Sequence, residues 1–149
     1  MYLSLDGSTT LGYNITGEGE TILFIPGILG SLQTYDPVIK VLKHQFQCIN
    51  IELAGQGGTT FNERTEPTHF SVEQHADDIC KLIDHLNIKS CHIVGLSYGS
   101  QVATCIANRL PEIICDVILL SVLLTNKTHH YQNWNYLWGM CSYDLEQFT

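Results

Sequence analysis

The sequence has few basic residues and lacks any long apolar run. Lys and Arg together number 7 of 149 residues, against 15 Asp and Glu, which gives a formal net charge of −8. So few cations cannot form the basic patch that nucleic acid or an anionic membrane surface requires. The most apolar run, Val117–Leu124, is too short to cross a bilayer. We therefore expect no nucleic-acid partner and no membrane span.

A secretory signal, a metal motif and a nucleotide motif are also missing. Residues 1–7 have no basic region followed by an apolar one, so we expect a cytoplasmic protein. The 6 cysteines include no Cys-x-x-Cys and no paired Cys/His spacing, so we predict no metal. The glycine-rich stretch 54–60 lacks both the Lys-Ser/Thr ending of a P-loop and the spacing Gly-x-Gly-x-x-Gly. We therefore predict no cofactor.

The cysteines themselves have two interpretations. Their even number allows a set of disulfides. Cys48, Cys91 and Cys105, however, fall in predicted core elements, and no secretion signal precedes them. Buried, reduced thiols are therefore the better interpretation.

What the sequence does contain is an alternation of strands and helices. With 44% hydrophobic and 15% charged residues, the chain has the composition and size of one globular domain. Its apolar patterns predict an α/β fold: a mostly parallel, doubly wound sheet with helices on both faces and antiparallel strands at its start. The predicted strands are 1–5, 10–15, 21–25, 48–53, one containing Ile93 and Val94, and 116–124, and the predicted helices are 35–46, 71–86 and one that ends at Leu110.

The most informative stretch is the pattern Gly95-x-Ser97-x-Gly99. It separates a buried strand from a helix with an apolar stripe. This is the nucleophile-elbow pattern, in which a serine at the tip of a tight strand-to-helix turn exposes its hydroxyl. Small residues two positions before and after it are needed because strand and helix pass close together there. The alternative is a glycine-rich turn in some other doubly wound protein.

A second loop, Pro26–Ser31, follows the predicted central strand 21–25. Open α/β sheets bind ligands beyond the carboxyl ends of their strands, so backbone N–H groups of this loop can face the same crevice as Ser97. An elbow serine needs a second oxyanion donor from a loop of this kind. The alternative is a simple strand-to-helix connection in which Gly27 and Gly30 serve only the turn.

In this order, the motifs resemble those of the α/β-hydrolase fold family, serine hydrolase type. Gly17-Glu18-Gly19 precedes the central strand, Pro26-Gly27-Ile28 is similar to the family's His-Gly-x loop, and Glu52–Gly57 is similar to its Asp-x-x-Gly-x-Gly turn. The resemblance covers residues 1–125, the N-terminal part of such a core. The aromatic segment 126–149 is similar to the start of the family's helical cap or lid.

The resemblance implies a set of roles for individual residues. Ser97 would be the nucleophile, the backbone N–H groups of Ile28 and Tyr98 would form the oxyanion hole, and Gly95 and Gly99 would be the elbow glycines. The substrate would be a small apolar or acyl-bearing molecule, such as an ester or thioester, attacked at its carbonyl carbon. An acyltransferase that uses the same serine is a near variant, which the sequence does not separate from a hydrolase.

Two departures from the family pattern bear on activity. Pro26 stands where the family usually has His, which removes a side-chain contact but leaves the Ile28 backbone donor. In the family, the acid and the base follow the nucleophile and lie after the cap. We therefore expect a chain truncated after its sixth main strand, without either group, in which Ser97 is a weak nucleophile.

No other residue is expected to replace the base or the acid. We expect His92 to be buried in the sheet and Asp116 to lie at the wrong end of its strand for the site. For every histidine a structural or solvated role is favoured. The remaining candidates, at a helix start and in the cap segment, are His69, His75, His129 and His130.

A non-catalytic binding module that keeps this half of the fold is the competing hypothesis. The sheet would end on the apolar strand 117–124, whose free edge invites self-association or a partner chain. A partner that supplied acid and base through this edge would reconcile the two hypotheses.

Overall fold

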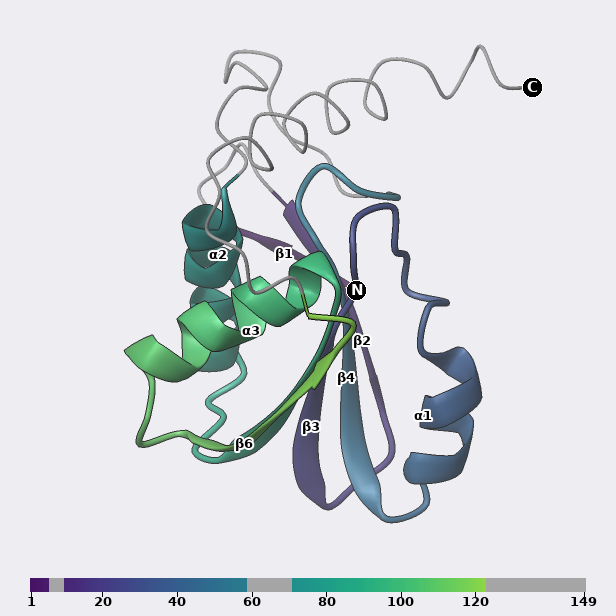
Figure 1. Ribbon diagram of the computed structural model, residues 1–149. Helices are drawn as coiled ribbons and strands as arrows, with labels where there is room; N and C mark the ends of the chain where they lie inside the picture. Colours follow the sequence, from purple (N-terminus) through teal and green to yellow (C-terminus); the bar gives the residue numbers. More distant parts are fainter. Residues whose placement is uncertain (6–9, 59–70, 123–149) are drawn as a thin grey trace, which may run out of the picture.

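The computed structural model describes residues 1–5, 10–58 and 71–122, which form a six-stranded sheet with three helices (Figure 1). The order of these elements along the chain confirms the predicted alternation. The strands are β1 (Tyr2–Ser4), β2 (Thr10–Thr16), β3 (Glu20–Ile25), β4 (Phe46–Glu52), β5 (Cys91–Leu96) and β6 (Ile114–Leu120), and the helices are α1 (Asp36–Leu42), α2 (Val72–His85) and α3 (Tyr98–Arg109).

The strands lie in the order β1-β2-β4-β3-β5-β6 across the sheet. β2 pairs antiparallel with both β1 and β4, whereas β4, β3, β5 and β6 run parallel to one another. α1 covers one face of the sheet, and α2 and α3 cover the other (Figure 1). The predicted fold class, a mostly parallel and doubly wound α/β sheet with helices on both faces, is therefore confirmed.

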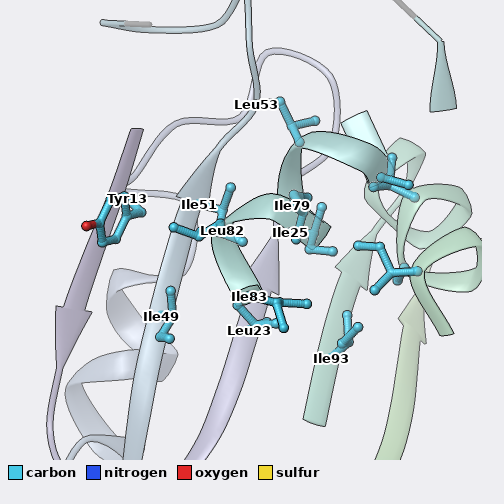
Figure 2. Close-up of a cluster of buried hydrophobic side chains, with 14 of the residues drawn as sticks. Tyr13, Leu23, Ile25, Ile49, Ile51, Leu53, Ile79, Leu82, Ile83 and Ile93 are labelled. Atoms are coloured by element: carbon cyan, nitrogen blue, oxygen red, sulfur yellow. The ribbon is translucent and has the colours of Figure 1, made fainter. Parts of the chain in front are cut away.

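Two cores lie on the two faces of the sheet, because successive side chains of a strand point in opposite directions. On β3, Leu23 and Ile25 pack on the side of α2 and α3, whereas Ile22 and Phe24 pack on the side of α1. Figure 2 shows the larger core, in which Ile83 of α2 lies beside Leu23. Burial of each such side chain contributes about 1.5–3 kcal/mol. This packing fixes the ends of β3 and β5, where the candidate site lies.

α2 begins at the predicted cap residue, Ser71. Its Oγ accepts a hydrogen bond of 3.1 Å from the Gln74 backbone N–H. The Gln74 side chain contacts the helix itself, where its Nε2 donates to Asp78 Oδ1 at 3.1 Å. Asp78 is buried and also lies 3.7 Å from Lys81 Nζ. These contacts hold the first turns of α2, which include His75, in a fixed place.

The predicted helix 35–46 is wrong at its C-terminal end. α1 ends at Leu42, and Phe46 already begins β4. The intervening turn packs tightly against the connection between β2 and β3, where a Cβ on Gly17 would lie 2.3 Å from the Phe46 carbonyl oxygen. The helix therefore ends before Phe46, the last apolar residue at helical spacing.

The predicted strand 116–124 is displaced. β6 begins at Ile114, because this residue pairs with Cys91 in the parallel register with β5. It ends at Leu120, and Ser121 then turns the chain with φ 54°. The end of the predicted strand, the domain boundary at 125 and the predicted cap, 126–149, lie outside the described residues.

Two further findings concern membranes and thiols. No helix in the described part of the chain has the length and apolar character needed to cross a membrane.

Burial raises the pKa of the Cys91 thiol to about 12, so this thiol stays protonated and unreactive at neutral pH. Cys141 lies outside the described residues. The other cysteines are all free thiols: Cys48, Cys80, Cys91, Cys105 and Cys115.

Candidate active site

Ser97 lies at the turn between the end of β5 and the start of α3. Its backbone has φ 53° and ψ −115°, which few residues other than glycine adopt. Strain of this kind costs on the order of 1–3 kcal/mol and persists only where surrounding contacts enforce it. Here the Ser97 N–H donates to the Leu120 carbonyl at 2.8 Å, and the Ser97 carbonyl accepts from the Ser100 N–H at 2.9 Å. The Ser97 side chain makes no capping hydrogen bond to α3, so the helix does not tie up its hydroxyl.

Gly95 and Gly99 allow the elements around Ser97 to approach closely. A Cβ on Gly95 would lie 2.5 Å from the Gly99 carbonyl oxygen, and a Cβ on Gly99 would lie 2.4 Å from the Ile25 carbonyl oxygen. Both contacts are with backbone, which cannot rotate aside as a long side chain can. Small residues on both sides of Ser97 are thus a steric requirement of this turn.

The loop that follows β3 runs beside Ser97. Ile25 pairs with Gly95 in the parallel register, so the residues that follow the two strands continue side by side. A Cβ on Gly27 would lie 3.3 Å from the Ser97 Cβ. The structure therefore brings the loop that carries Ile28 next to the serine.

Two amide side chains hold this loop from the side of β4. Asn50 Nδ2 donates to the Leu32 carbonyl, and Gln56 Nε2 donates to the Gly27 carbonyl over 3.5 Å. The Gly27 carbonyl and the Ile28 N–H belong to one trans peptide group, so the N–H points away from the Gln56 amide. Gln56 thus helps to set the direction of the Ile28 N–H.

Tyr98, the first residue of α3, is buried and contacts His75 of α2 edge to face, with 5.7 Å between the ring centroids. The Tyr98 hydroxyl lies 2.9 Å from His75 Nδ1, and His75 Nε2 lies 3.3 Å from the Ala54 carbonyl oxygen. Because a carbonyl only accepts, we assign the ring proton to Nε2, and Nδ1 then accepts from the Tyr98 hydroxyl. Burial lowers the pKa of His75 to about 4, against a smaller opposing effect of the Ala54 bond, so this imidazole is neutral at pH 7.

The other candidate base and acid lie far from Ser97. The expectation that His92 is buried is wrong, because its side chain is 25% exposed, with Nδ1 2.9 Å from Asp116 Oδ2 and Nε2 3.9 Å from Glu20. His92 is the register partner of Ile22 and so points to the α1 face of the sheet, where α1 packs against β4 rather than over β5 (Figure 1). Asp116 lies at the amino-terminal end of the parallel strands, as expected, opposite to Ser97.

No base for Ser97 is found in the part of the chain that the structure describes. Within residues 1–5, 10–58 and 71–122, no imidazole or carboxylate forms a hydrogen bond with this serine, and no three His, Cys, Asp or Glu gather to hold a metal. His69, His129 and His130 lie outside these residues. The structure thus brings together Ser97, the Ile28 loop and Tyr98, without a proton acceptor.

Sequence reasoning missed the contact between His75 and Tyr98. One signal was present, because His75 falls at helical spacing with Ile79 and Leu82 on the apolar face of α2. A polar ring on such a face requires a hydrogen-bond partner in the core. The identity of that partner depends on how α2 packs against α3, which the spacing along one helix does not contain.

The alpha/beta hydrolase fold family has a model that matches residues 20–148 of this chain. This match spans most of the chain and includes β3–β6, the loop after β3 and Ser97. The chain therefore belongs to the alpha/beta hydrolase fold family.

Individual relatives share a quarter or more of their aligned residues with this chain. RutD of Pantoea ananatis, which is assigned as a carbamate hydrolase, is 26% identical over 113 residues, or 73% of this chain and 40% of RutD. The chloroplastic protein PHYLLO of Arabidopsis thaliana is 29% identical over 109 residues, or 70% of this chain and 6% of PHYLLO. The chain thus spans less than half the length of either relative.

A solved structure shows the same fold. A hydrolase from Pseudomonas aeruginosa matches 99% of this chain with a TM-score of 0.84 and 18% sequence identity. The match covers 55% of the Pseudomonas chain. At this level of identity the likeness concerns the fold alone.

Proposed function

We propose that this chain carries the nucleophile and the oxyanion hole of a serine hydrolase. Ser97 is the nucleophile, and the backbone N–H groups of Ile28 and Tyr98 are the oxyanion donors. The observation that carries the proposal is the strained Ser97 backbone, φ 53°, at the end of β5, with Gly27 packed against the serine Cβ. Strain at a strand-to-helix turn is retained where a side chain has to be presented for chemistry.

The proposed reaction is acyl transfer. The Ser97 hydroxyl oxygen attacks the carbonyl carbon of an ester, thioester or related acyl compound, and its proton passes to a base. The negative charge that develops on the carbonyl oxygen is bound by the two N–H donors, each worth about 10²–10³ in rate. Collapse of this intermediate expels the alcohol or thiol, and water then releases the acid from the acyl-enzyme. The N-terminus of α3 adds a favourable field for the developing charge.

The absence of a base near Ser97 among the described residues sets the expected rate. Without a proton acceptor, a serine hydroxyl is a weak nucleophile. Serine hydrolases that lose members of their triad keep roughly 10³–10⁴-fold catalysis over water from the oxyanion hole and binding. We therefore expect the 149-residue chain to hydrolyse even activated esters slowly.

The acceptor of the acyl group separates two variants of this proposal. Water as acceptor gives a hydrolase, and another nucleophile gives an acyltransferase with the same Ser97. RutD is assigned as a carbamate hydrolase, so we favour water. Within the hydrolases, we propose a small apolar or acyl-bearing substrate.

A second candidate function is a binding module that acts through its sheet edge. Among the described strands, β6 pairs with β5 on one side only. Ile118 and Leu120 on this strand are 51% and 42% exposed, which is unusual for large apolar side chains. A free strand edge with apolar side chains favours pairing with another chain or a second copy. Sedimentation that shows a monomer at all concentrations would exclude self-association.

The test of Ser97 uses acylation rather than turnover. Deacylation also needs a base, so p-nitrophenyl butyrate should leave a persistent butyryl group on Ser97, detected by mass spectrometry of the purified chain. Ser97→Ala should abolish the adduct. The matched control is Ser90→Ala, which removes an exposed serine just before β5, at the opposite end of the same strand. An adduct that persists in Ser97→Ala, or none in the wild-type chain, would contradict the proposal.

A further inference from the structure

We propose that His75 is a positioning residue for the oxyanion hole: anchored to Ala54 as a neutral imidazole, it holds the Tyr98 side chain and thereby the Tyr98 backbone N–H beside Ser97. This inference rests on the proposed function, because only acyl transfer uses that N–H as an oxyanion donor.

The geometry ties three parts of the fold to one residue of the site. His75 lies on α2, Ala54 lies in the turn after β4, and Tyr98 begins α3. The imidazole is fully buried, and its two nitrogens contact Tyr98 and Ala54 at 2.9 and 3.3 Å. On the other side of the turn, the Ser97 N–H is bound to Leu120. The backbone around the proposed donor is therefore held on one side by the Leu120 carbonyl at the end of β6 and on the other by the Tyr98 ring.

The direction of both hydrogen bonds requires the neutral ring. Nε2 donates to Ala54 and Nδ1 accepts from the tyrosine hydroxyl, and a protonated ring would lose the second bond. The charged group one turn further along α2, Asp78, is already engaged by Gln74 and Lys81. Burial keeps the pKa of His75 near 4, which leaves this arrangement intact at neutral pH.

The turn after β4 is connected by hydrogen bonds to both proposed oxyanion donors, Tyr98 and Ile28. This distinguishes His75 from a histidine that only fills the core. Ala54 receives the bond from His75, which holds Tyr98. Two residues later, Gln56 donates to the Gly27 carbonyl, whose peptide group carries the Ile28 N–H. Any hydrogen-bond partner would satisfy a histidine that only fills the core. His75 instead joins Tyr98, the residue after the proposed nucleophile, to the turn after β4, which also orients the Ile28 N–H.

The experiment compares variants of His75 with a core control on the same helix. His75→Phe keeps a ring and removes both hydrogen bonds, and His75→Gln offers both a donor and an acceptor. Ile79→Val, also fully buried on α2, weakens packing and leaves the hydrogen bonds of His75 in place. The readouts are the butyrylation rate of Ser97 with p-nitrophenyl butyrate, amide hydrogen exchange at Tyr98, and the ¹⁵N shifts of the His75 ring.

We expect His75→Phe to slow acylation by about 10- to 100-fold at saturating ester, the scale for a misplaced catalytic group. Exchange at the Tyr98 amide should rise by about tenfold or more. His75→Gln should recover part of both, and Ile79→Val should change neither. The wild-type ring should show a protonated Nε2 and a bare Nδ1 from pH 7 down to pH 5.

Tyr98→Phe removes the same hydrogen bond from the other side and serves if His75→Phe does not fold. Its effect should match that of His75→Phe, and the double variant should be no slower than either single one, because the two residues act through one contact. The inference is overturned if Ser97 is acylated equally fast in His75→Phe, Tyr98→Phe and the wild type, or if Nδ1 carries the proton. Absence of any acylation in the wild type would instead overturn the proposed function, and the donor role with it.

Discussion

The two ends of β5 lie in opposite surroundings. At the carboxyl end, a Cβ on Gly95 or Gly99 would meet backbone at distances that leave no space for it, and the Ser97 backbone between them is strained. At the amino end, His92 Nδ1 lies 2.9 Å from Asp116 Oδ2, and both side chains are in contact with water. One end of the strand is tightly constrained by its neighbours, and the other is an ordinary protein surface.

One buried histidine, His75, and one partly exposed histidine, His92, show the same contrast. His75 has no exposed surface and a lowered pKa, so it works as a neutral hydrogen-bonding ring. His92 is a quarter exposed and pairs with carboxylates. Burial, rather than residue type, decides which chemistry an imidazole contributes. In parallel sheets the ligand crevice lies beyond the carboxyl ends of the strands, and the constrained end of β5 is that end.

The largest effect is expected where the carboxyl end is most crowded. Gly99→Ala would place a Cβ 2.4 Å from the Ile25 carbonyl oxygen and 2.5 Å from that of Pro26, so backbone has to move. We expect the free energy of unfolding to fall by about 3–5 kcal/mol, measured by urea denaturation. The control is Gly27→Ala, whose Cβ would lie 3.2 Å from the Leu96 carbonyl oxygen, with an expected loss of about 1 kcal/mol. Equal losses in the two variants would show that the backbone around Gly99 accommodates a Cβ as easily as the backbone around Gly27.

The next effect is a pH dependence specific to the buried histidine. The pKa of His75 is about 4 in the folded chain against 6.5 ordinarily, so the unfolded chain binds this proton more readily. Its stabilising contribution is therefore complete above about pH 6.5 and is lost as the pH falls toward 4, by about 3 kcal/mol in all.

Urea denaturation at pH 7 and pH 4.5 measures that loss as a difference between variants. His75→Gln should lose less stability on acidification than the wild type, because glutamine does not titrate. Ile79→Val, a buried substitution on the same helix that changes no titratable group, should keep the wild-type dependence. A wild type and a His75→Gln variant with the same dependence would mean that His75 does not resist protonation.

Features that depend on the local sequence pattern could be predicted from the sequence. The order of strands and helices and the place of Ser97 between β5 and α3 follow from apolar spacing and glycine positions, although the role of Ser97 as nucleophile stays a prediction. The contact of His75 with Tyr98 could not be predicted, because it depends on how two helices pack. The same limit explains the wrong end of the helix 35–46 and the exposure of His92. Phe46 belongs to β4 through tertiary packing, and His92 is exposed because α1 packs against β4 rather than over β5.

The smallest effect is expected at the amino end of β5. Asp116→Asn removes the carboxylate charge beside His92, where the aspartate side chain is 70% exposed. Exposed pairs of this kind contribute about 0–1 kcal/mol and are screened by salt. We therefore expect the free energy of unfolding to fall by less than about 1 kcal/mol at low salt, with the difference vanishing near 1 M NaCl. Acylation of Ser97 should be unchanged, since the pair lies at the opposite end of the strand. A loss comparable to that of Gly99→Ala, or slower acylation, would show that the two ends of β5 are coupled and that the amino end is more than a surface.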